Sequence, residues 1–321
     1  MNAQRGFALV SVIWILAVLT VLTLGFGHRA LLDHRAAATA GDHVRCLNMA
    51  AGACNYGVAL LRNQAALQGV YDALNMETPP PVSVVHPDLI NALKVYRPGD
   101  PGSYLGDVAR AVITDEESRI SLNDSPEDVL DELEELSFTT VNDIMRRRSG
   151  PLSDDDDTTQ PFLAVEEVRD LDGVTDRAWF GSEDSPGLRE RFTVYGDGLI
   201  NVNTASEEVL EAVPDLDSDI VSAILAYRSG PDGDLNTADD RRFRSFDVIS
   251  GLTRVSPERL APLSRYCKLE SRFFTVTGFA TLRQGKIRAQ VKAVVEITGE
   301  GAVIHKWSEG VEGTDDIPGG F

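Results

Sequence analysis

The side chains of this sequence that could do chemistry together lie in one acidic segment, which runs from Asp232 to Asp240 and reads DGDLNTADD. Asp232, Asp234 and Asn236 stand at its first, third and fifth positions, and Asp240 stands at the ninth. Oxygen ligands at this spacing converge on one hard cation in calcium loops of the EF-hand type. The segment therefore predicts a calcium site, with the carbonyl group of Ala238 as a further ligand at position seven.

The segment also departs from an EF-hand loop. Thr237 occupies the position usually held by glycine, and no glutamate stands at position twelve, so another carboxylate that the sequence does not identify must complete the site. The alternative is a solvated acidic turn. The run Asp154 to Asp157, which aligns with this segment in an internal repeat described below, has Leu152 at its first position and is more typical of a solvated acidic run.

No catalytic site is predicted. The sequence has no Gly-x-Ser-x-Gly, no His-Glu-x-x-His and no glycine loop for phosphate. Five histidines and three cysteines leave little material for a transition-metal site. Among 321 residues, 30 are basic and 50 are acidic, and the net charge of −20 argues against nucleic acid or anionic lipid as a partner.

The cysteines leave two interpretations open. Cys46 and Cys54 are eight residues apart on a predicted helix, which separates them by about 12 Å and excludes a disulfide between them. Either could pair with Cys267, or the helix cysteines could be small buried apolar side chains.

The N-terminal region contains a predicted membrane helix, 7–27. Its run from Phe7 to Phe26 has no charge and no proline, and twenty helical residues span about 30 Å, the thickness of a bilayer core. A secretory signal peptide has a shorter apolar region, and here the helical pattern continues past Arg29. The sequence therefore favours a retained membrane helix over a cleaved signal.

The short leader MNAQRG, followed directly by Phe7, resembles the leader of type IV prepilins and pseudopilins. The resemblance implies that residues 1–6 are removed by a prepilin peptidase, which cuts after Gly6 and methylates Phe7. Most members of this family carry glutamate at the fifth mature position, where this chain has Ser11. In this family that carboxylate pairs with the N-terminal amine of the neighbouring subunit. A subunit without the carboxylate therefore needs no subunit above it in the filament. Its absence is typical of the large minor pseudopilins of type II secretion systems, whose N-terminal helix the segment from Trp14 to Arg35 also resembles.

The expected fold is α+β, with a pilin-like long N-terminal helix packed on an antiparallel sheet. An alanine-rich apolar stripe predicts that the helix continues to about Arg62, and PPPVSVVHP, residues 79–87, predicts a loop. Residues 28–115 form the first part of the pilin-like domain, with strands at 105–113 and, just after it, 120–122. Residues 269–310 form its C-terminal strands at 273–282, 286–297 and 302–308, and 311–321 is an expected flexible tail.

Residues 116–268 form a predicted inserted all-α domain of two duplicated helical units. The two units repeat at an offset of eighty residues, which aligns Ile120 with Ile200 and Asn123 with Asn203. In each unit a first helix is expected to begin at a cap, Asp124 or Thr204. A second helix ends at Ser-Gly-Pro, and a third follows near 165–171 or 246–252.

The second unit resembles the opening of helix-hairpin-helix modules, which bind DNA. However, its turn, 214–217, contains two acidic residues and no glycine, so we expect a helical repeat used for packing.

Taken together, the resemblance implies a non-enzymatic minor pseudopilin at the tip of a type II secretion pseudopilus. Such a subunit initiates pseudopilus assembly and protein export, binds calcium, and lies in the bacterial inner membrane with a single span and a periplasmic globular part. Implied partners are the minor pseudopilins of the I and J types, other pseudopilins in the membrane and the prepilin peptidase. One alternative is a membrane-anchored nucleic-acid receptor of a competence system, built on the helix-hairpin-helix likeness. Another is a periplasmic enzyme on a membrane anchor.

Overall fold

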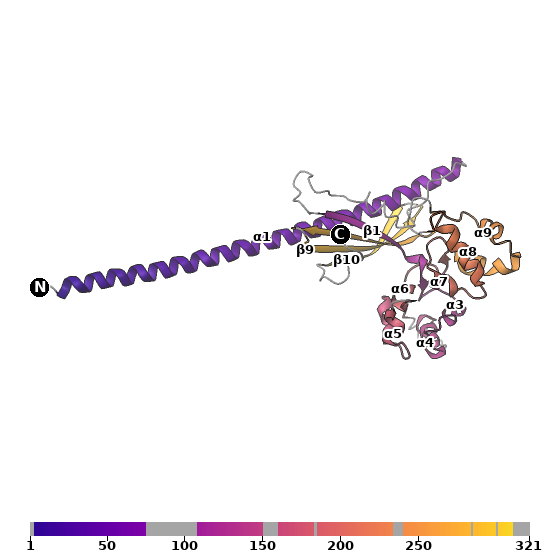
Figure 1. Cartoon of the computed structure of the whole chain (residues 1–321), viewed down its shortest axis with the longest axis horizontal. Helices are drawn as coiled ribbons and strands as arrows, with labels where there is room; N and C mark the ends of the chain where they lie inside the picture. The colour runs from indigo at the N-terminus through magenta and orange to yellow at the C-terminus, as the bar shows by residue number, and fades with distance from the viewer. Residues whose placement is uncertain are drawn as a thin grey trace.

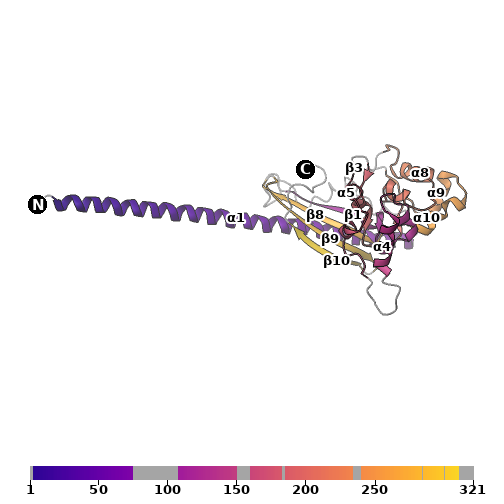
Figure 2. The same cartoon turned by 90° about the horizontal axis from the view of Figure 1, so that it is seen from below.

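The computed structural model describes residues 3–74, 108–149, 160–182, 185–233, 240–283, 285–299 and 301–310. A long N-terminal helix lies along an antiparallel sheet, and a mainly helical insertion stands at the end of the sheet away from the N-terminus (Figures 1 and 2). The buried apolar side chains form two separate cores, one between the helix and the sheet and one inside the insertion. The predicted α+β arrangement of a long helix on an antiparallel sheet is therefore confirmed.

Helix α1 (Ala3–Leu74) is continuous over 72 residues. Its N-terminal half extends away from the rest of the molecule, and its later part packs on the sheet (Figure 1). The packed face carries small side chains, Cys46, Ala50, Ala53 and Cys54, which are all fully buried. They allow a close approach to the sheet at Gly278, where an added Cβ would lie 2.1 Å from the carbonyl oxygen of Ala50.

The sheet has four antiparallel strands in the order β1-β8-β9-β10: β1 (Val108–Asp115), β8 (Phe273–Leu282), β9 (Ile287–Thr298) and β10 (Gly301–Gly310). The last three form the predicted meander, and β8 has the predicted bounds. Alternate residues of β9 face α1, which is why Ile287, Ala289, Val291, Ala293 and Val295 are all buried in the core shared with the helix.

The insertion begins with the 3₁₀ helix η1 (Glu116–Ser118) and contains two units of similar element order. The first unit contains β2 (Ile120–Ser121), α3 (Glu127–Asp131), α4 (Phe138–Ser149), η2 (Val165–Asp170), α5 (Asp176–Phe180), β3 (Gly181–Ser182), β4 (Ser185–Pro186), α6 (Leu188–Arg191) and β5 (Phe192–Thr193). The second contains β6 (Ile200–Asn201), α7 (Glu207–Glu211), α8 (Ser218–Arg228), α9 (Phe246–Thr253), η3 (Pro257–Leu260), α10 (Ala261–Tyr266) and β7 (Cys267–Lys268).

Each unit closes on itself through a short parallel strand pair, which the sequence analysis did not predict. In the first unit β2 pairs with β5, and in the second β6 pairs with β7. One asparagine holds each closure. Asn123 binds the backbone of Phe162 through both its oxygen (2.8 Å) and its amide nitrogen (3.0 Å), and Asn203 binds Phe243 in the same way (2.7 and 3.0 Å). The duplication seen in the sequence is therefore also a duplication of hydrogen bonding.

The predicted helix caps are wrong by two residues. Helix α3 begins after Pro126, and α7 begins after Ser206, whose hydroxyl accepts from the amide of Val209. Thr204 does not cap α7, because its hydroxyl donates to Asp115 at 2.6 Å. The predicted loop 79–87, the acidic run 154–157 and the predicted tail 311–321 lie outside the described residues.

Candidate functional site: the exposed helix, the acidic segment and the sheet junction

The N-terminal half of α1 exposes an apolar surface. Between Val10 and Phe26, twelve large apolar side chains are about half-exposed or more: Val10, Val12, Ile13, Trp14, Ile15, Leu16, Val18, Leu19, Val21, Leu22, Leu24 and Phe26. This part of α1 includes an 18-residue window that is apolar enough to cross a membrane and has none of its residues buried. By length and composition, the helix is therefore a candidate single membrane span.

Polar groups in this candidate span are compatible with lipid. The hydroxyls of Thr20 and Thr23 donate to the carbonyl oxygens of Leu16 and Leu19 at 2.7 Å, so neither needs water as a partner. Ser11 is half-buried, and the first acidic residue of the chain is Asp33. The span therefore has no carboxylate at the position where the resembling family usually has one.

The predicted processing site lies at the start of the same helix. Because α1 begins at Ala3, the backbone at Gly6 and Phe7 is helical. The structure places Gly6, Phe7 and Ser11 on one helix, at the end of the chain most distant from the insertion (Figure 1). The sequence had predicted that the helix begins only at Phe7, after the leader, and the processing site itself stays a prediction.

The structure describes both ends of the acidic segment. Asp232 is exposed just after α8, and Asp240 is half-buried, while Asp234 and Asn236 lie outside the described residues. Within the described ranges, no group of three His, Cys, Asp or Glu side chains is placed to hold a metal ion. The calcium site therefore stays a prediction, since two of its four expected side-chain ligands are not described.

A buried arginine lies beside this segment. Arg228, at the end of α8, is 7 % exposed and donates to the carbonyl oxygen of Ala205 at 2.5 Å. Burial lowers its pKa to about 10, and the negative charge of Asp240 opposes that shift. Both residues line a cavity of about 590 Å³, together with Asp115 at the end of β1. Asp240, at the end of the acidic segment, therefore lies near the place where the insertion joins the sheet.

Sequence reasoning missed the junction between the sheet and the insertion. The acidic triplet, which we define as Asp115, Glu116 and Glu117, is 5 %, 6 % and 1 % exposed. Three consecutive acidic residues normally indicate a solvated turn, and these are buried because the insertion folds over them. Only the tertiary fold reveals their role, since, apart from Arg119, their side-chain partners outside η1 come from segments far away in the sequence.

The acidic triplet binds both helical units and the returning chain. Its partners are Thr193 of the first unit, Asn201, Thr204 and Lys268 of the second, and Ser271, Arg272 and Thr275 where the chain returns to β8. Glu117 forms an ion pair with Lys268 at 2.6 Å and accepts from the backbone amide of Arg272 at 2.6 Å. The triplet therefore joins the three parts of the chain that meet at this point.

The pKa of Asp115 is raised from 3.8 to about 6, chiefly by burial. Hydrogen bonds from Thr204, Ser271 and the amide of Glu117 stabilise the carboxylate and lower the pKa, but less than burial raises it. The nearby charge of Glu117 adds to the upward shift.

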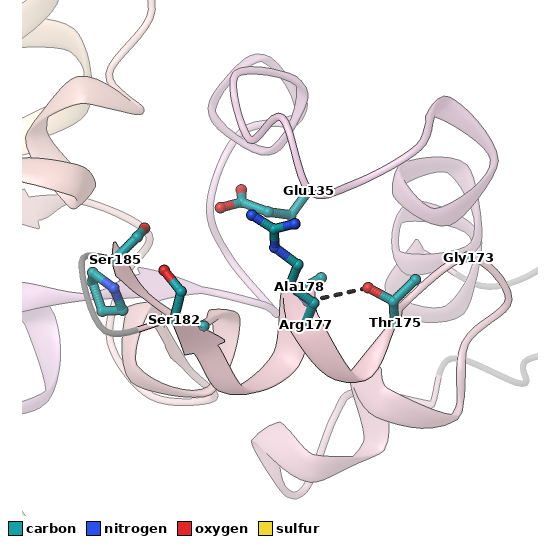
Figure 3. A pocket seen from close by; sticks show the side chains of 9 residues that line it. Glu135, Gly173, Thr175, Arg177, Ala178, Ser182 and Ser185 are labelled. Atoms are coloured by element: carbon teal, nitrogen blue, oxygen red, sulfur yellow. Dashed lines mark hydrogen bonds between the residues drawn. The ribbon is translucent and has the colours of Figure 1, made fainter.

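A smaller pocket of about 310 Å³ lies in the first helical unit. Figure 3 shows Arg177 beside Glu135, with Ser182 and Ser185 of the β3–β4 hairpin on the other side. Glu135 also forms an ion pair with the buried Arg191. None of the described lining residues is a histidine or a cysteine.

The turn that resembles a helix-hairpin-helix module is acidic in the structure. Asp215 has a left-handed backbone (φ 58°), and Asp217 and Asp219 accept from Arg259 at 2.5 and 3.0 Å. More broadly, residues 115–271 hold 37 acidic and 16 basic residues, a net charge of −21 (16 − 37), while the rest of the chain has +1. The negative charge of the protein is therefore concentrated in the insertion.

The three cysteines are buried and none forms a disulfide, so neither pairing with Cys267 is formed. The thiols of Cys46 and Cys54 donate to the carbonyl oxygens of Ala280 and Val276 at 3.3 Å in the helix–sheet core, whereas Cys267 lies in the core of the insertion. Burial raises the pKa of Cys54 to about 11 and that of Cys267 to about 12. The helix cysteines act as small packing residues, as one of the two interpretations held.

Comparison with known proteins gives little sequence similarity. No protein-family model matches the chain, and no curated protein matches it. Among solved structures, the chain is similar to the crystal structure of the GspK-GspI-GspJ complex from the enterotoxigenic Escherichia coli Type 2 Secretion System. That likeness has a TM-score of 0.42 and 11 % sequence identity, and it covers 64 % of this chain and 81 % of the other.

Proposed function

We propose that this chain is a minor pseudopilin of the GspK type, which acts by assembly at the tip of a type II secretion pseudopilus. The observation that carries the proposal is α1. One unbroken helix begins at Ala3, exposes an apolar surface as far as Phe26 and then packs along an antiparallel sheet. The leader-like junction of Gly6 and Phe7 lies at its start.

The proposed role requires the apolar half of α1 to lie in the bacterial inner membrane, with the sheet and the insertion in the periplasm. There, α1 would pack against the helices of other pseudopilins, and the I and J types of minor pseudopilin would be direct partners. No acidic residue precedes Asp33, which supports a place for this chain at the first position in the filament. Without a carboxylate in the lipid, the chain does not need to pair with the amine of a subunit above it.

Calcium is a further part of the proposal. Asp232, Asp234, Asn236 and Asp240 would hold the ion, and the turn after α8 would be fixed by joining their oxygen atoms. The ion would act on folding and not on chemistry, since its binding free energy would be added to the stability of the second helical unit.

The test of the proposal is the mass of the N-terminal peptide after co-expression with a prepilin peptidase. We expect a chain that begins at methylated Phe7. In a Gly6→Leu variant we expect the leader to be retained, and in the control Gly25→Leu we expect normal processing, because Gly25 has no atom within 4 Å and lies beyond the junction. An intact Met1, or cleavage near Gly27, would remove the pseudopilin proposal.

The tip position is tested separately by Ser11→Glu in the native secretion system. We expect the variant to be processed but to lower export, because a carboxylate at the tip has no amine to pair with in lipid. Ser11→Ala is the matched control and should leave export unchanged. If Ser11→Glu exports as well as Ser11→Ala, the tip assignment is wrong even where processing occurs.

A further inference from the structure

The pocket of the first helical unit is formed by a segment that the second unit lacks. Helix α5 and the β3–β4 hairpin line this space of about 310 Å³ (Figure 3). In the second unit, residues 240–268 contain no hairpin, and yet both units close with the same kind of parallel strand pair. The closure of a unit therefore does not require the pocket. The insertion also stands at the end of the molecule away from the N-terminus, where a partner in solution can reach it (Figure 1).

Arg177 is a cation of this pocket that has no anion bound to it. Its side chain is exposed, lies beside Glu135 and makes no hydrogen bond or ion pair with any described residue (Figure 3). Glu135 is bound elsewhere, since it forms an ion pair with Arg191, which is only 6 % exposed. The nearby Arg169 and Arg189 also each bind a carboxylate. Arg177 therefore has its charge available for a ligand.

The hydroxyl groups of the pocket can also donate. Those of Ser182 and Ser185 have no partner among the described residues. The hydroxyl of Thr175 accepts from the amide of Ala178 at 3.1 Å, which leaves its own proton free to donate. A guanidinium and three hydroxyls thus line one space whose described carboxylate, Glu135, is already paired. A ligand of this space must supply acceptors, and a carboxylate matches the planar fork of an arginine.

Exposed aromatic side chains border the same pocket. Phe180 is 44 % exposed and directly precedes Gly181, which lines the pocket. Phe138 is 75 % exposed and follows Ser137, whose hydroxyl oxygen lies 3.2 Å from the position of a Cβ added to Gly173 in the pocket lining. Aromatic and arginine side chains together are typical of the centres of protein–protein contacts. The border of the pocket therefore favours a protein segment over a free acid as its ligand.

We propose that the pocket of the first helical unit is a recognition site for an acidic loop of a partner protein. A carboxylate side chain of the loop binds Arg177 and the hydroxyls, and its apolar neighbours pack on Phe138 and Phe180. The net negative charge of the insertion opposes such a partner at long range. That repulsion is screened beyond about 8 Å in physiological salt, whereas the contact with Arg177 is direct. The inference uses neither the membrane nor the filament role of the chain.

The test is a binding titration of the full chain in detergent, with the peptide acetyl-Leu-Asp-Leu-amide as the probe and acetyl-Leu-Asn-Leu-amide as its neutral control. The readouts are the NMR signals of the Arg177 side-chain Nε–H and of the backbone amide of Gly181, which both belong to the pocket lining. We expect the Asp peptide to shift both signals. It should bind at least about tenfold more tightly than the Asn peptide, because only a carboxylate forms charge-assisted hydrogen bonds with the guanidinium.

Two pairs of variants assign the binding to this pocket. Arg177→Gln should weaken binding of the Asp peptide about tenfold without changing the free energy of unfolding, because the side chain has no described partner to lose. Arg254→Gln is the matched control, since it removes the same charge from an exposed arginine of the second unit that also has no ion pair among the described residues. Phe138→Ala should weaken binding about fivefold. Leu163→Ala, at a side chain that is 76 % exposed and does not line the pocket, should leave it unchanged.

Three outcomes would overturn the inference. Equal binding of the two peptides, or equal effects of Arg177→Gln and Arg254→Gln, would mean that the pocket does not recognise a carboxylate. Acetate that binds as tightly as the Asp peptide would indicate a free acid, and not a protein loop, as the ligand. Binding that occurs only after Glu183→Gln and Asp184→Asn would mean that the chain's own carboxylates, between β3 and β4 in the sequence, occupy the pocket.

Discussion

The two helical units of the insertion have the same closure but differ in what they add to it. In both, a short parallel strand pair and one asparagine join the beginning of the unit to its middle and its end. The first unit adds the β3–β4 hairpin, whereas the second has the acidic segment after α8. The residues that the two units share therefore form the strand pair and the asparagine hydrogen bonds of each unit. The units differ from each other at the pocket of the first and at the predicted ion site of the second.

The hairpin accounts for the difference in length after the shared phenylalanine. Phe192 follows Phe162 by 30 positions, and the equivalent Cys267 follows Phe243 by only 24. The six additional residues equal the span from Gly181 to Pro186, which forms the hairpin. The pocket of Figure 3, which Ser182 and Ser185 help to line, is therefore a feature of the first unit's additional segment.

The largest expected effect comes from breaking the first unit at this hairpin. At Gly187 an added Cβ would lie 2.2 Å from the carbonyl oxygen of Trp179 and 2.5 Å from the amide nitrogen of Gly181. Both are backbone atoms that cannot move aside, so Gly187→Ala should lower the free energy of unfolding by about 3 kcal/mol or more. Hydrogen exchange should show the loss in the first unit and not in the second.

The matched control for this variant is Gly251→Ala in α9 of the second unit. No atom lies within 4 Å of the Cβ that it would add, and alanine favours a helix over glycine. We expect the control to be neutral or to stabilise by about 0.5–1 kcal/mol. A Gly187→Ala protein as stable as the wild type would contradict the hairpin packing.

A second variant pair tests the equivalence of the two closures. Asn123→Ala and Asn203→Ala each leave two carbonyl groups and one amide without a partner, and each should therefore cost about 2–4 kcal/mol. Chemical denaturation would measure both. Asn142→Ala, which removes a single exposed bond to Phe138, should cost about 0.5 kcal/mol or less. If one of the two closure variants were as mild as this control, the units would not be equivalent.

A third experiment separates the units by calcium. If the acidic segment of the second unit binds the ion, a chelator should lower the melting temperature and reduce hydrogen-exchange protection in α8 and α9. Relative to saturating calcium, the free energy of unfolding should fall by up to about 3 kcal/mol. Asp232→Asn should abolish the difference between calcium and chelator. Asp156→Asn changes the aligned run of the first unit and should preserve it. An equal effect of both variants would indicate bulk charge and not a site.

Much of the fold could be predicted because its signals are local. The apolar run from Phe7 predicts α1, the alternation in 273–282 predicts β8, and the repeated Ile and Asn predict two equivalent units. The acidic segment could also be recognised in the sequence as a candidate calcium site, because the ligands of a calcium loop follow one another at fixed spacing within a short segment.

The remaining features depend on partners that are distant in the sequence. Thr204 has the residue type of a helix cap, but its hydroxyl donates a hydrogen bond to Asp115, 89 positions earlier. Ser206 caps helix α7 instead. Glu116 binds Thr275 across 159 positions. From the sequence alone the acidic triplet therefore has the pattern of a solvated turn, and the parallel closures of the two units have no local signal.

The smallest expected effect concerns the contact between the two units. Asp128 in α3 of the first unit accepts from the hydroxyl of Tyr266 in α10 of the second at 2.8 Å, and Arg265 lies 3.3 Å from the same carboxylate. Because Asp128 and Arg265 are both exposed, the ion pair contributes little, and Tyr266→Phe should cost about 1 kcal/mol or less. A double-mutant cycle with Asp128→Ala should give a coupling energy of about 0.5–1 kcal/mol. A coupling energy of zero would mean that this contact adds nothing to the association of the two units beyond their shared apolar core and the acidic triplet.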